Sequence, residues 1–394
     1  MNRTDKIGLI ADDFTGAMDT GAQFADYGFD TSFALSSFPA SQVVVLNTAS
    51  REIQPHESRA RCIQAVRRLQ GRTLFKKIDS LLRGHIGAEL DGLVSASIRS
   101  KIVVCPISPH QGHMVRDGLL FVHDTPVHES IFKADPAFPA HTSSVAELVG
   151  IPSTHLALET VRRPVQELAN AISMAPTAVV TVDAIDAEDL LQVSRAILMN
   201  NFLPCGGAGL ANAWAQTLTG GKPFEKKTAF PHPDGPLLIV AGSANAKTHE
   251  QISALASHPE SLIWKINVPL SHGEKEAWFE IVQAKWSDVR VVVMCPGRQF
   301  TVRDPEWLIF YQTVSCLAVE LLQRIRPASI LITGGETGNH LCGLLDVHAV
   351  RLIGEALPGI PFGKVSGGQA DKITLLTKAG GNGQADCLEK IVYG

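Results

Sequence analysis

Apolar and polar positions follow one another along the chain in blocks that predict alternating strands and helices. In the N-terminal half, short apolar runs rich in β-branched residues are separated by longer segments with helical periodicity; the runs are IGLIA, TSFAL, QVVVLNT, TLFKKI and KIVVCP. Runs of this kind are typical of parallel strands that are buried on both faces. The pattern therefore predicts an α/β fold, with a mainly parallel sheet flanked by helices.

The periodic pattern stops after Cys105 and returns near residue 144. The stretch between them is rich in Pro, His and Asp, which predicts a long irregular loop, and loops of this length are usually functional. Beyond it we predict a helix at 161–173, a strand at 177–184, a helix at 188–200 and a turn at 205–218.

A second α/β series begins near Pro236. Its predicted strands are LLIVA, SLIWKI, RVVVMC, ASILIT and ITLLT, with helices at about 246–256, 274–286 and 313–325. The stretch 219–236 concentrates Gly, Pro and Lys and predicts a linker. Because 394 residues exceed what one hydrophobic core usually supports, we expect two domains, 1–225 and 226–394.

Three glycine-rich turns mark the second series. GSANAKT from Gly242, TGGETGNH from Thr333 and KAGGNGQAD from Lys378 each follow an apolar run and precede a helix-like segment. Backbone N–H groups in such turns can converge on an anion at a helix N-terminus. One Gly-Gly pair would be weak evidence, but three turns in one domain predict nucleotide binding. The absence of G-x-x-x-x-G-K-[ST] excludes a P-loop, and no G-x-G-x-x-G supports a dinucleotide site.

Polar residues gather where the first predicted strands end. Asp12 and Asp13 follow the first strand, at the edge where open α/β sheets bind ligands. Helix capping accounts for one of these carboxylates but hardly for both. Arg51 follows the third strand and offers a planar fork for a carboxylate, although pairing with Glu52 is an equally simple interpretation.

The segment from Lys76 to Arg83 gives a stronger signal. Its mixed charges at a strand end are poorly explained by a solvated helix face; the candidate ligands are Lys77, Asp79, Ser80 and Arg83. The cations could neutralise a carboxylate, while Asp79 could hold a hydroxyl group or act as a base. The histidine spacing matches no metal motif, so no metal ligands are assigned.

Composition narrows the range of partners. A net charge of -4 and a pI of about 6.4 make binding to nucleic acid or acidic membranes unfavourable. Seven cysteines without a C-x-x-C pair suggest neither a disulfide framework nor a zinc site. Since no apolar run approaches the length of a membrane span and the N-terminus lacks a secretory signal, we expect a cytoplasmic protein with a small-molecule substrate.

Taken together, the motifs resemble the four-carbon acid sugar kinase family, whose members phosphorylate threonate, erythronate or 3-oxo-tetronates with ATP. The resemblance covers nearly the whole chain and rests on IADDFTGAMDTG, LNTASR, KKIDSLLRGHIGAEL, CPISPHQGHMVRDGLLFVHDTPVHES, GGAGLANA, VAGSAN, ITGGETGN, IGEALPGIPFG and TKAGGNG. The chain departs from the family pattern at His113, where Arg is usual, so a cationic contact is missing or depends on pH. Asn382 also stands where an aromatic residue is usual.

The resemblance implies how the work is divided between the domains. The N-terminal domain would bind the sugar acid through Asp12, Asp13, Arg51 and the 77–83 segment, with Asp13 as the first choice for the base and Asp79 as the second. The C-terminal domain would bind ATP through Ser243, Gly334, Gly335, Glu336, Thr337 and Gly381. Mg²⁺ would bridge phosphate oxygens, and the active site would lie in the cleft between the domains.

The expected reaction is phosphorylation of the terminal 4-hydroxyl group of D-threonate. A 3-oxo-tetronate or erythronate 4-kinase is the nearest alternative. A sugar-acid dehydrogenase or isomerase with another phosphate-bearing cofactor, a kinase of another family and a non-catalytic sugar-acid sensor also remain open. The chain shows no readable oligomer interface, and a homodimer is possible.

Overall fold

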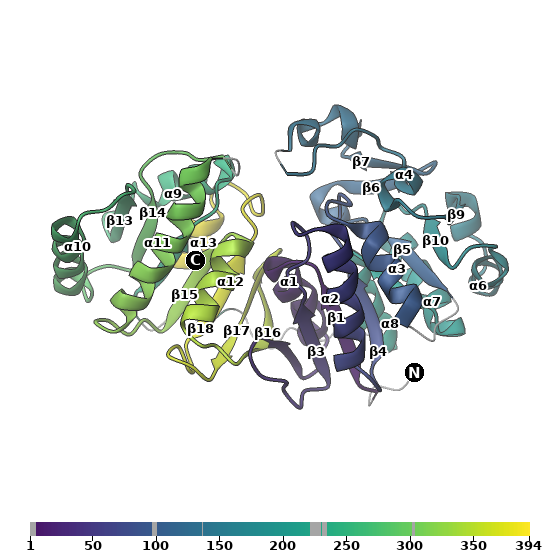
Figure 1. Cartoon of the computed structure of the whole chain (residues 1–394), viewed down its shortest axis with the longest axis horizontal. Coiled ribbons are helices and arrows are strands. Elements are labelled where there is room, and N and C mark those ends of the chain that lie inside the picture. Colours follow the sequence, from purple (N-terminus) through teal and green to yellow (C-terminus); the bar gives the residue numbers. More distant parts are fainter. Residues whose placement is uncertain (1–4, 97–100, 136, 221–229, 231–234, 302–303) are drawn as a thin grey trace. The chain divides into compact units, whose positions relative to one another are not determined.

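The computed structural model describes residues 5–96, 101–135, 137–220, 230, 235–301 and 304–394. The chain forms two compact units (Figure 1): Met1–Thr31 with Ala40–Glu225, and Ser32–Pro39 with Lys226–Gly394. Both units are α/β, which confirms the predicted fold class and the presence of two domains. Most of the predicted linker, 219–236, lies outside the described residues.

The sheet of the first unit is parallel throughout its described strands, in the order β3-β1-β4-β11-β5-β10-β9. Its strands are β1 (Ile7–Ala11), β3 (Val43–Asn47), β4 (Thr73–Lys77), β5 (Ile102–Cys105), β9 (Ser153–Leu156), β10 (Val179–Val182) and β11 (Leu203–Gly206). Because β1, β3 and β4 are neighbours and run in the same direction, their carboxyl ends meet at one edge. The polar residues that follow these strands are therefore brought together.

Helices cover the first sheet in two packed groups. One group pairs α2 (Pro55–Arg68) with α3 (Ile86–Ala96); the other joins α1 (Phe14–Asp26), α8 (Ala208–Leu218), α7 (Ala187–Asn200) and α6 (Val165–Met174). The prediction of a turn at 205–218 was wrong, because this stretch forms the end of β11 and then α8. The predicted helix at 161–173 is interrupted before Pro164, which cannot donate a backbone hydrogen bond, and it divides into α5 (Leu158–Val161) and α6.

The segment after Cys105 is more regular than predicted. It contains a small antiparallel sheet of β6 (His113–Arg116), β7 (Leu119–Val122) and β8 (Thr125–Pro126), followed by the 3-10 turn η3 (Ile131–Ala134) and helix α4 (Val145–Val149). Asp117 and Gly118, with φ angles of 54° and 73°, join β6 to β7. A two-residue Asp-Gly connection of this kind is typical of a β-hairpin, and this hairpin was not predicted.

The second unit contains a mixed sheet in the order β13-β14-β12-β15-β18-β17-β16-β2. Its parallel strands are β12 (Leu237–Ala241), β13 (Ser261–Ile266), β14 (Val291–Pro296), β15 (Ser329–Thr333) and β18 (Thr374–Lys378). The hairpin of β16 (Ala349–Leu357) and β17 (Ile360–Ser366) is antiparallel and was not predicted. Most of β2 (Thr31–Ala34) belongs to this unit, where the backbone N–H groups of Leu35 and Ser37 donate to the carbonyl of His348.

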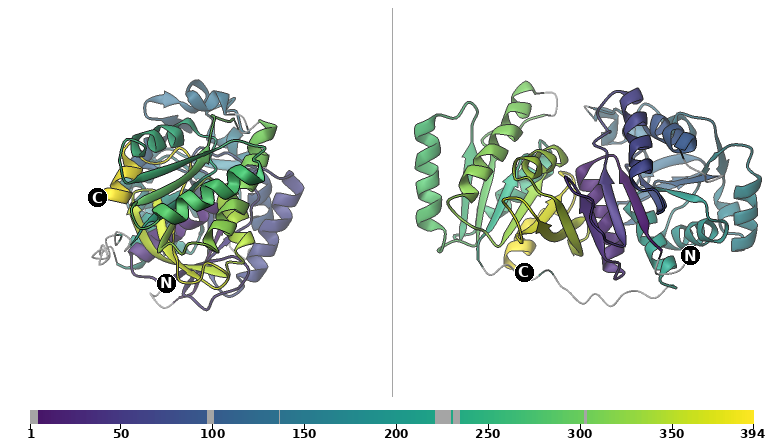
Figure 2. Two further views of the ribbon diagram at one scale, coloured as in Figure 1. Left: turned by 90° about the vertical axis from the view of Figure 1, so that its left-hand side faces the viewer. Right: turned by 60° about the horizontal axis from the view of Figure 1, so that its bottom comes forward.

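The helices of the second unit also pack in groups (Figures 1 and 2). Helices α9 (Ala246–Leu255) and α13 (Cys387–Tyr393) pack together over a buried apolar cluster that includes β12, β14 and β17, and α11 (Pro305–Leu322) packs on α12 (Gly335–Leu344). Helix α11 begins earlier than predicted, because Asp304 caps it and Pro305 occupies its first turn. In the part of the chain that the structure describes, no helix is long and apolar enough to cross a membrane.

Candidate active site

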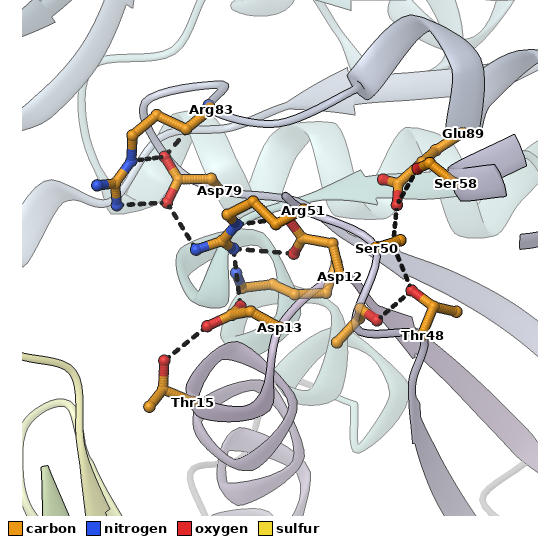
Figure 3. Close-up of polar contacts among 12 residues, drawn as sticks. Asp12, Asp13, Thr15, Thr48, Ser50, Arg51, Ser58, Asp79, Arg83 and Glu89 are labelled. Atoms are coloured by element: carbon orange, nitrogen blue, oxygen red, sulfur yellow. Dashed lines mark hydrogen bonds and ion pairs between the residues drawn. The ribbon is translucent and has the colours of Figure 1, made fainter. Parts of the chain in front are cut away.

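Arg51 lies at the centre of a polar cluster at the carboxyl ends of β1, β3 and β4 (Figure 3). Its Nε and Nη2 atoms donate to the two oxygens of Asp12, at 2.7 and 2.9 Å, and Nη2 also donates to Asp13 Oδ1 at 2.7 Å. Its Nη1 atom is 3.6 Å from Asp79 Oδ2. The guanidinium group therefore joins three carboxylates, two that follow β1 and one that follows β4, and none of these is Glu52.

Asp79 is held by a second arginine. Arg83 donates to both Asp79 oxygens, at 3.0 and 2.8 Å, and the Leu81 amide donates to Oδ1 at 2.9 Å. The other side of Arg83 reaches Asp135 Oδ2, 3.2 Å away at the end of η3. The irregular segment is thus tied to the cluster by an ion pair.

These ion pairs set the charge states of the cluster. Burial opposes ionisation of Asp12 and Asp79, but the neighbouring arginines and Lys77 outweigh it and lower the pKa of both carboxyl groups. Burial also opposes the charge on Arg51, but the three carboxylates together raise its pKa. All three side chains are therefore ionised near neutral pH.

Lys77 brings a third cation to the cluster. Its side chain is buried at the end of β4, and among the described residues it has no carboxylate within 4.0 Å. Gly16, in the first turn of α1, leaves the space that Lys77 and Asp13 use. A Cβ at position 16 would lie 2.9 Å from Lys77 Nζ and 2.3 Å from Asp13 Oδ1. Lys77 is therefore the cation of the cluster best placed to accept an added anion.

His113 lies against Ser80, with 2.9 Å between its Nδ1 atom and Ser80 Oγ. Burial lowers the pKa of His113 to about 4, with opposing contributions from nearby charges such as Asp79 and Arg83. The imidazole is therefore neutral near neutral pH. His113 supplies a hydrogen-bonding group in this position rather than a cation.

A buried network supports the turn that carries Arg51. Glu89 in α3 pairs with the fully buried Lys76 at 2.9 Å, and it accepts hydrogen bonds from the hydroxyl groups of Ser50 and Ser58. Thr48 Oγ1 lies 2.6 Å from Ser50 Oγ and donates to the Ala11 carbonyl (Figure 3). Glu89 was not among the predicted site residues. A hint was available in Lys76, because a lysine inside an apolar strand needs a buried partner.

The three glycine turns of the second unit converge around Ser243. A Cβ on Gly334, where φ is 98°, would lie 3.3 Å from Ser243 N, and one on Gly380 would lie 2.1 Å from Ser243 Oγ. A Cβ on Gly242 would lie 2.0 Å from Thr337 Oγ1. Side chains at these glycines would separate the turns, which explains why glycine occupies the three positions.

The turns offer groups suited to an anion. Helix α12 starts after Gly334 without a side-chain cap, so its first N–H groups, from Gly335 onward, lack acceptors within the helix. The hydroxyl groups of Thr333 and Thr337 are buried and have no hydrogen-bond partner in the described residues. Glu336 is exposed, whereas Ser243 and Thr337 are buried. Two cavities of 310 and 210 Å³ in this unit are lined by other residues.

No group of three or more His, Cys, Asp or Glu side chains among the described residues is arranged to hold a metal ion.

Two family models match the chain. A sugar-binding N-terminal domain matches residues 7–214, and a nucleotide-binding C-terminal domain matches residues 238–388. A solved structure from Salmonella typhimurium LT2, described as a putative tRNA synthase, has the same fold, with a TM-score of 0.81 and 22% identity over 98% of both chains. The class is therefore a two-domain protein with sugar-binding and nucleotide-binding domains.

The curated relatives identify the family. The chain is 31% identical to a D-threonate kinase of Bordetella bronchiseptica over 97% of this chain and 95% of the relative, and 28% identical to one of Salmonella typhimurium over 98% of both. A D-erythronate kinase of Heliobacterium modesticaldum is 26% identical, covering 96% and 95%. The chain belongs to the four-carbon acid sugar kinase family, and its activity is transfer of a phosphoryl group to a hydroxyl group of a sugar acid.

A solved structure from Bordetella bronchiseptica is 30% identical over 98% of this chain and 97% of its own, with a TM-score of 0.50. It is described as a domain of unknown function with bound citrate, crystallised as a domain-swapped dimer.

Proposed function

We propose that the chain is an ATP-dependent kinase that phosphorylates the 4-hydroxyl group of D-threonate. The observation that supports this best is a pair of chemically different sites. The first unit carries three carboxylates and three cations in one cluster, and the second carries three glycine turns around Ser243. The relatives at 31% and 28% identity are D-threonate kinases and the one at 26% is a D-erythronate kinase, which favours D-threonate over erythronate or 3-oxo-tetronate.

The first unit would bind the acid by matching its charges. Asp12, Asp13 and Asp79 offset the charges of Arg51, Lys77 and Arg83, and Asp135 adds a further negative charge beside Arg83. Because both arginines already face carboxylates, the substrate carboxylate would approach Lys77, helped by Ser80, while Arg51 orients the aspartates that hold the hydroxyl groups. The citrate bound by the relative from Bordetella bronchiseptica is a carboxylate ligand too, which is consistent with an acid-binding protein.

Asp13 is the proposed base. Asp79 is a poor choice because Arg83 occupies both of its oxygens and its pKa is strongly lowered. Asp13 is more exposed, with 18% of its side chain accessible against 1% for Asp12 and 9% for Asp79. It also accepts a hydrogen bond from Thr15 Oγ1 at 2.6 Å, which fixes its orientation.

In the proposed reaction, the substrate O4 atom forms a bond to the γ-phosphorus while its proton passes to Asp13. The bond from the γ-phosphorus to the oxygen that bridges to the β-phosphate breaks, and ADP leaves. The phosphates of ATP would lie on the turns at Ser243, Gly334 to Thr337 and Gly381, close to the N-terminus of α12. Mg²⁺ would neutralise phosphate charge. The location of the active site between the two domains stays a prediction.

The test is ADP release from Mg-ATP with a panel of both threonates, both erythronates and their 3-oxo derivatives. D-threonate is expected to have the highest kcat/KM, and phosphorus NMR should locate the new phosphomonoester on O4. A higher kcat/KM for D-erythronate or a 3-oxo-tetronate would contradict the proposed substrate. Absence of ADP release with every acid, in a protein that binds ATP, would contradict the proposed acceptor class.

Asp13→Asn provides the internal check on the site. It is expected to lower kcat by roughly 10²-fold or more while the affinity for ATP stays nearly unchanged. Asp91→Asn is the matched control, because Asp91 forms an exposed ion pair with Arg59 in the same unit. A near-normal kcat for the Asp13 variant would remove Asp13 as the base.

A further inference from the structure

Lys378 occupies an unusual position beneath the third glycine turn. Its side chain is completely buried at the end of β18, and its Nζ atom donates to the carbonyl oxygens of Ala379, Gly380 and Asn382, at 3.1, 3.0 and 3.2 Å. An ammonium group has three N–H donors, so these carbonyls use all of them. The turn 379–384 is therefore wrapped around a cation that belongs to the strand before it.

Two side chains of α9 hold the same turn from the other side. Thr248 donates to the Gly380 carbonyl at 3.1 Å. The fully buried Gln251 donates from Nε2 to the carbonyls of Asn382 and Gln384, at 3.1 and 2.9 Å. The carbonyl oxygens of the turn thus point toward Lys378 and α9, which leaves little freedom for the peptide groups to rotate.

The opposite side of the same peptide groups is unpaired. Within the described part of the chain, the amide N–H groups of Gly380 and Gly381 have no hydrogen-bond acceptor. Gly381 is also open, since a Cβ built there would have Asn245 Nδ2, at 3.6 Å, as its nearest neighbour. Adjacent free N–H groups in a fixed turn form a concave site suited to an anion.

The charge balance also calls for an anion. No carboxylate among the described residues lies within 4.0 Å of Lys378, nor of Lys247 in the first turn of α9. A buried cation that faces only carbonyl dipoles is costly, and burial lowers the pKa of Lys378 to about 8. A negatively charged group on the turn would offset that cost.

We propose that Lys378, Gln251 and Thr248 are positioning residues that hold the turn 379–384 open as a binding site for a phosphate group of the nucleotide. None of the three needs to touch the ligand. They fix the carbonyls on one side of the turn so that the N–H groups of Gly380 and Gly381 face the other, and Lys378 adds positive charge behind them. This inference rests on the proposed function, because it takes the nucleotide as the ligand.

The test compares binding of ADP and of adenosine to the full-length protein by calorimetric titration. In Lys378→Met, which keeps the length of the side chain, the Kd for ADP is expected to rise about tenfold or more. The Kd for adenosine should change less than twofold, because adenosine has no phosphate. In steady-state assays, KM for ATP should rise while KM for the sugar acid stays unchanged, a difference that a general loss of folding would not produce.

Lys364→Met is the matched control. Lys364 lies on β17 in the same unit and donates to Thr374 Oγ1 at 2.7 Å, so its loss removes the same charge from another place. It should leave the Kd for ADP within about twofold of the wild-type value. If Lys378→Met does not fold, Gln251→Met removes two of the supporting hydrogen bonds without changing the charge, and it should weaken ADP binding by a smaller factor.

The outcomes separate the two proposals. Wild-type protein that binds no nucleotide would overturn the proposed function together with this inference. Wild-type protein that binds ADP, while folded Lys378→Met and Gln251→Met bind ADP and adenosine as the wild type does, would overturn the inference alone. Equal loss of ADP and adenosine affinity would also count against it, since a phosphate site should not affect adenosine.

Discussion

At the scale of single residues, His113 shows how position changes the chemistry of a side chain. Because His113 stands where the family usually has Arg, the sequence predicted that a cationic contact is missing at this position or depends on pH. In the structure the ring is buried against Ser80, and burial lowers its pKa to about 4 from the ordinary 6.5. A histidine that stays neutral can exchange hydrogen bonds with a substrate hydroxyl group, which a permanent cation cannot do in both directions.

This shift predicts how stability depends on pH. Because the pKa of His113 is lower in the folded chain than in the unfolded chain, the unfolded chain binds the proton more readily between pH 6.5 and 4. Stability should therefore fall as the pH drops through that window, with a loss at pH 5 of about 2 kcal/mol. Urea unfolding at pH 7 and pH 5 measures the difference.

In His113→Gln, which retains a side chain able to hydrogen-bond Ser80, the loss of stability from pH 7 to pH 5 should be smaller by about 2 kcal/mol. His56→Gln is the control, because His56 is exposed in the first turn of α2. An unchanged difference in His113→Gln would mean that the imidazole is not held neutral by the fold.

The residues of the candidate site differ in how readily they can be predicted from the sequence. Asp12, Asp13, Arg51 and Asp79 could be placed together because each follows a strand of one parallel sheet. Which of them pair with one another could not be predicted. Arg51 pairs with Asp12 and Asp13, which follow a different strand, and not with Glu52, its neighbour in the sequence. The roles of buried charged residues such as Glu89 and Lys378 are hard to predict from the sequence. A single charged residue beside an apolar run has no periodicity that would indicate its partner.

At the scale of elements, the three glycine turns pack closely against one another. Gly381 differs from the other glycines of these turns. Gly242, Gly334 and Gly380 have no room for a side chain, whereas Gly381 faces open space and has no positive φ angle. An alanine at position 381 should therefore fold without strain. Its methyl group would nevertheless stand where a phosphate approaches the turn.

Gly381→Ala is expected to keep the wild-type melting temperature and to raise KM for ATP by about tenfold, a loss of about 1.4 kcal/mol in binding. Gly343→Ala is the matched control, because a Cβ built on Gly343 in α12 would have no atom within 4 Å. Removing a helical glycine should stabilise that variant by up to about 1 kcal/mol without changing KM for ATP. If KM for ATP is normal in Gly381→Ala, the phosphate does not approach Gly381.

The strands were the most predictable elements. LLIVA, SLIWKI and IGLIA coincide with β12, β13 and β1, because buried parallel strands are short, apolar and bounded by turn residues. The antiparallel pairs β6–β7 and β16–β17 were missed. β6 and β16 mix buried residues with partly or fully exposed ones, and β16 and β17 contain Gly or Pro, so these strands do not form continuous apolar runs. Asn382 shows a further connection, since it donates to the Gly359 carbonyl at the turn of the β16–β17 hairpin.

At the scale of the whole molecule, each candidate site is built within one compact unit. The carboxylate cluster comes from residues 12–16, 48–51 and 76–83 of the first unit, and the glycine turns come from residues 242–248, 333–337 and 378–384 of the second. Local ordering by a ligand should therefore begin in the unit that supplies its contacts. Hydrogen exchange followed by mass spectrometry can observe both sets of peptides in one experiment.

We expect ADP alone to slow exchange in the second set of peptides and D-threonate alone to slow it in the first. The Gly381→Ala variant should lose the protection by ADP but keep the protection by D-threonate, because the two sites share no residue. The Asp13→Asn variant should lose the protection by D-threonate but keep the protection by ADP. Protection of the first set by ADP, with no change in the second, would contradict the assignment of the nucleotide to the glycine turns, and with it the division of labour between the two domains.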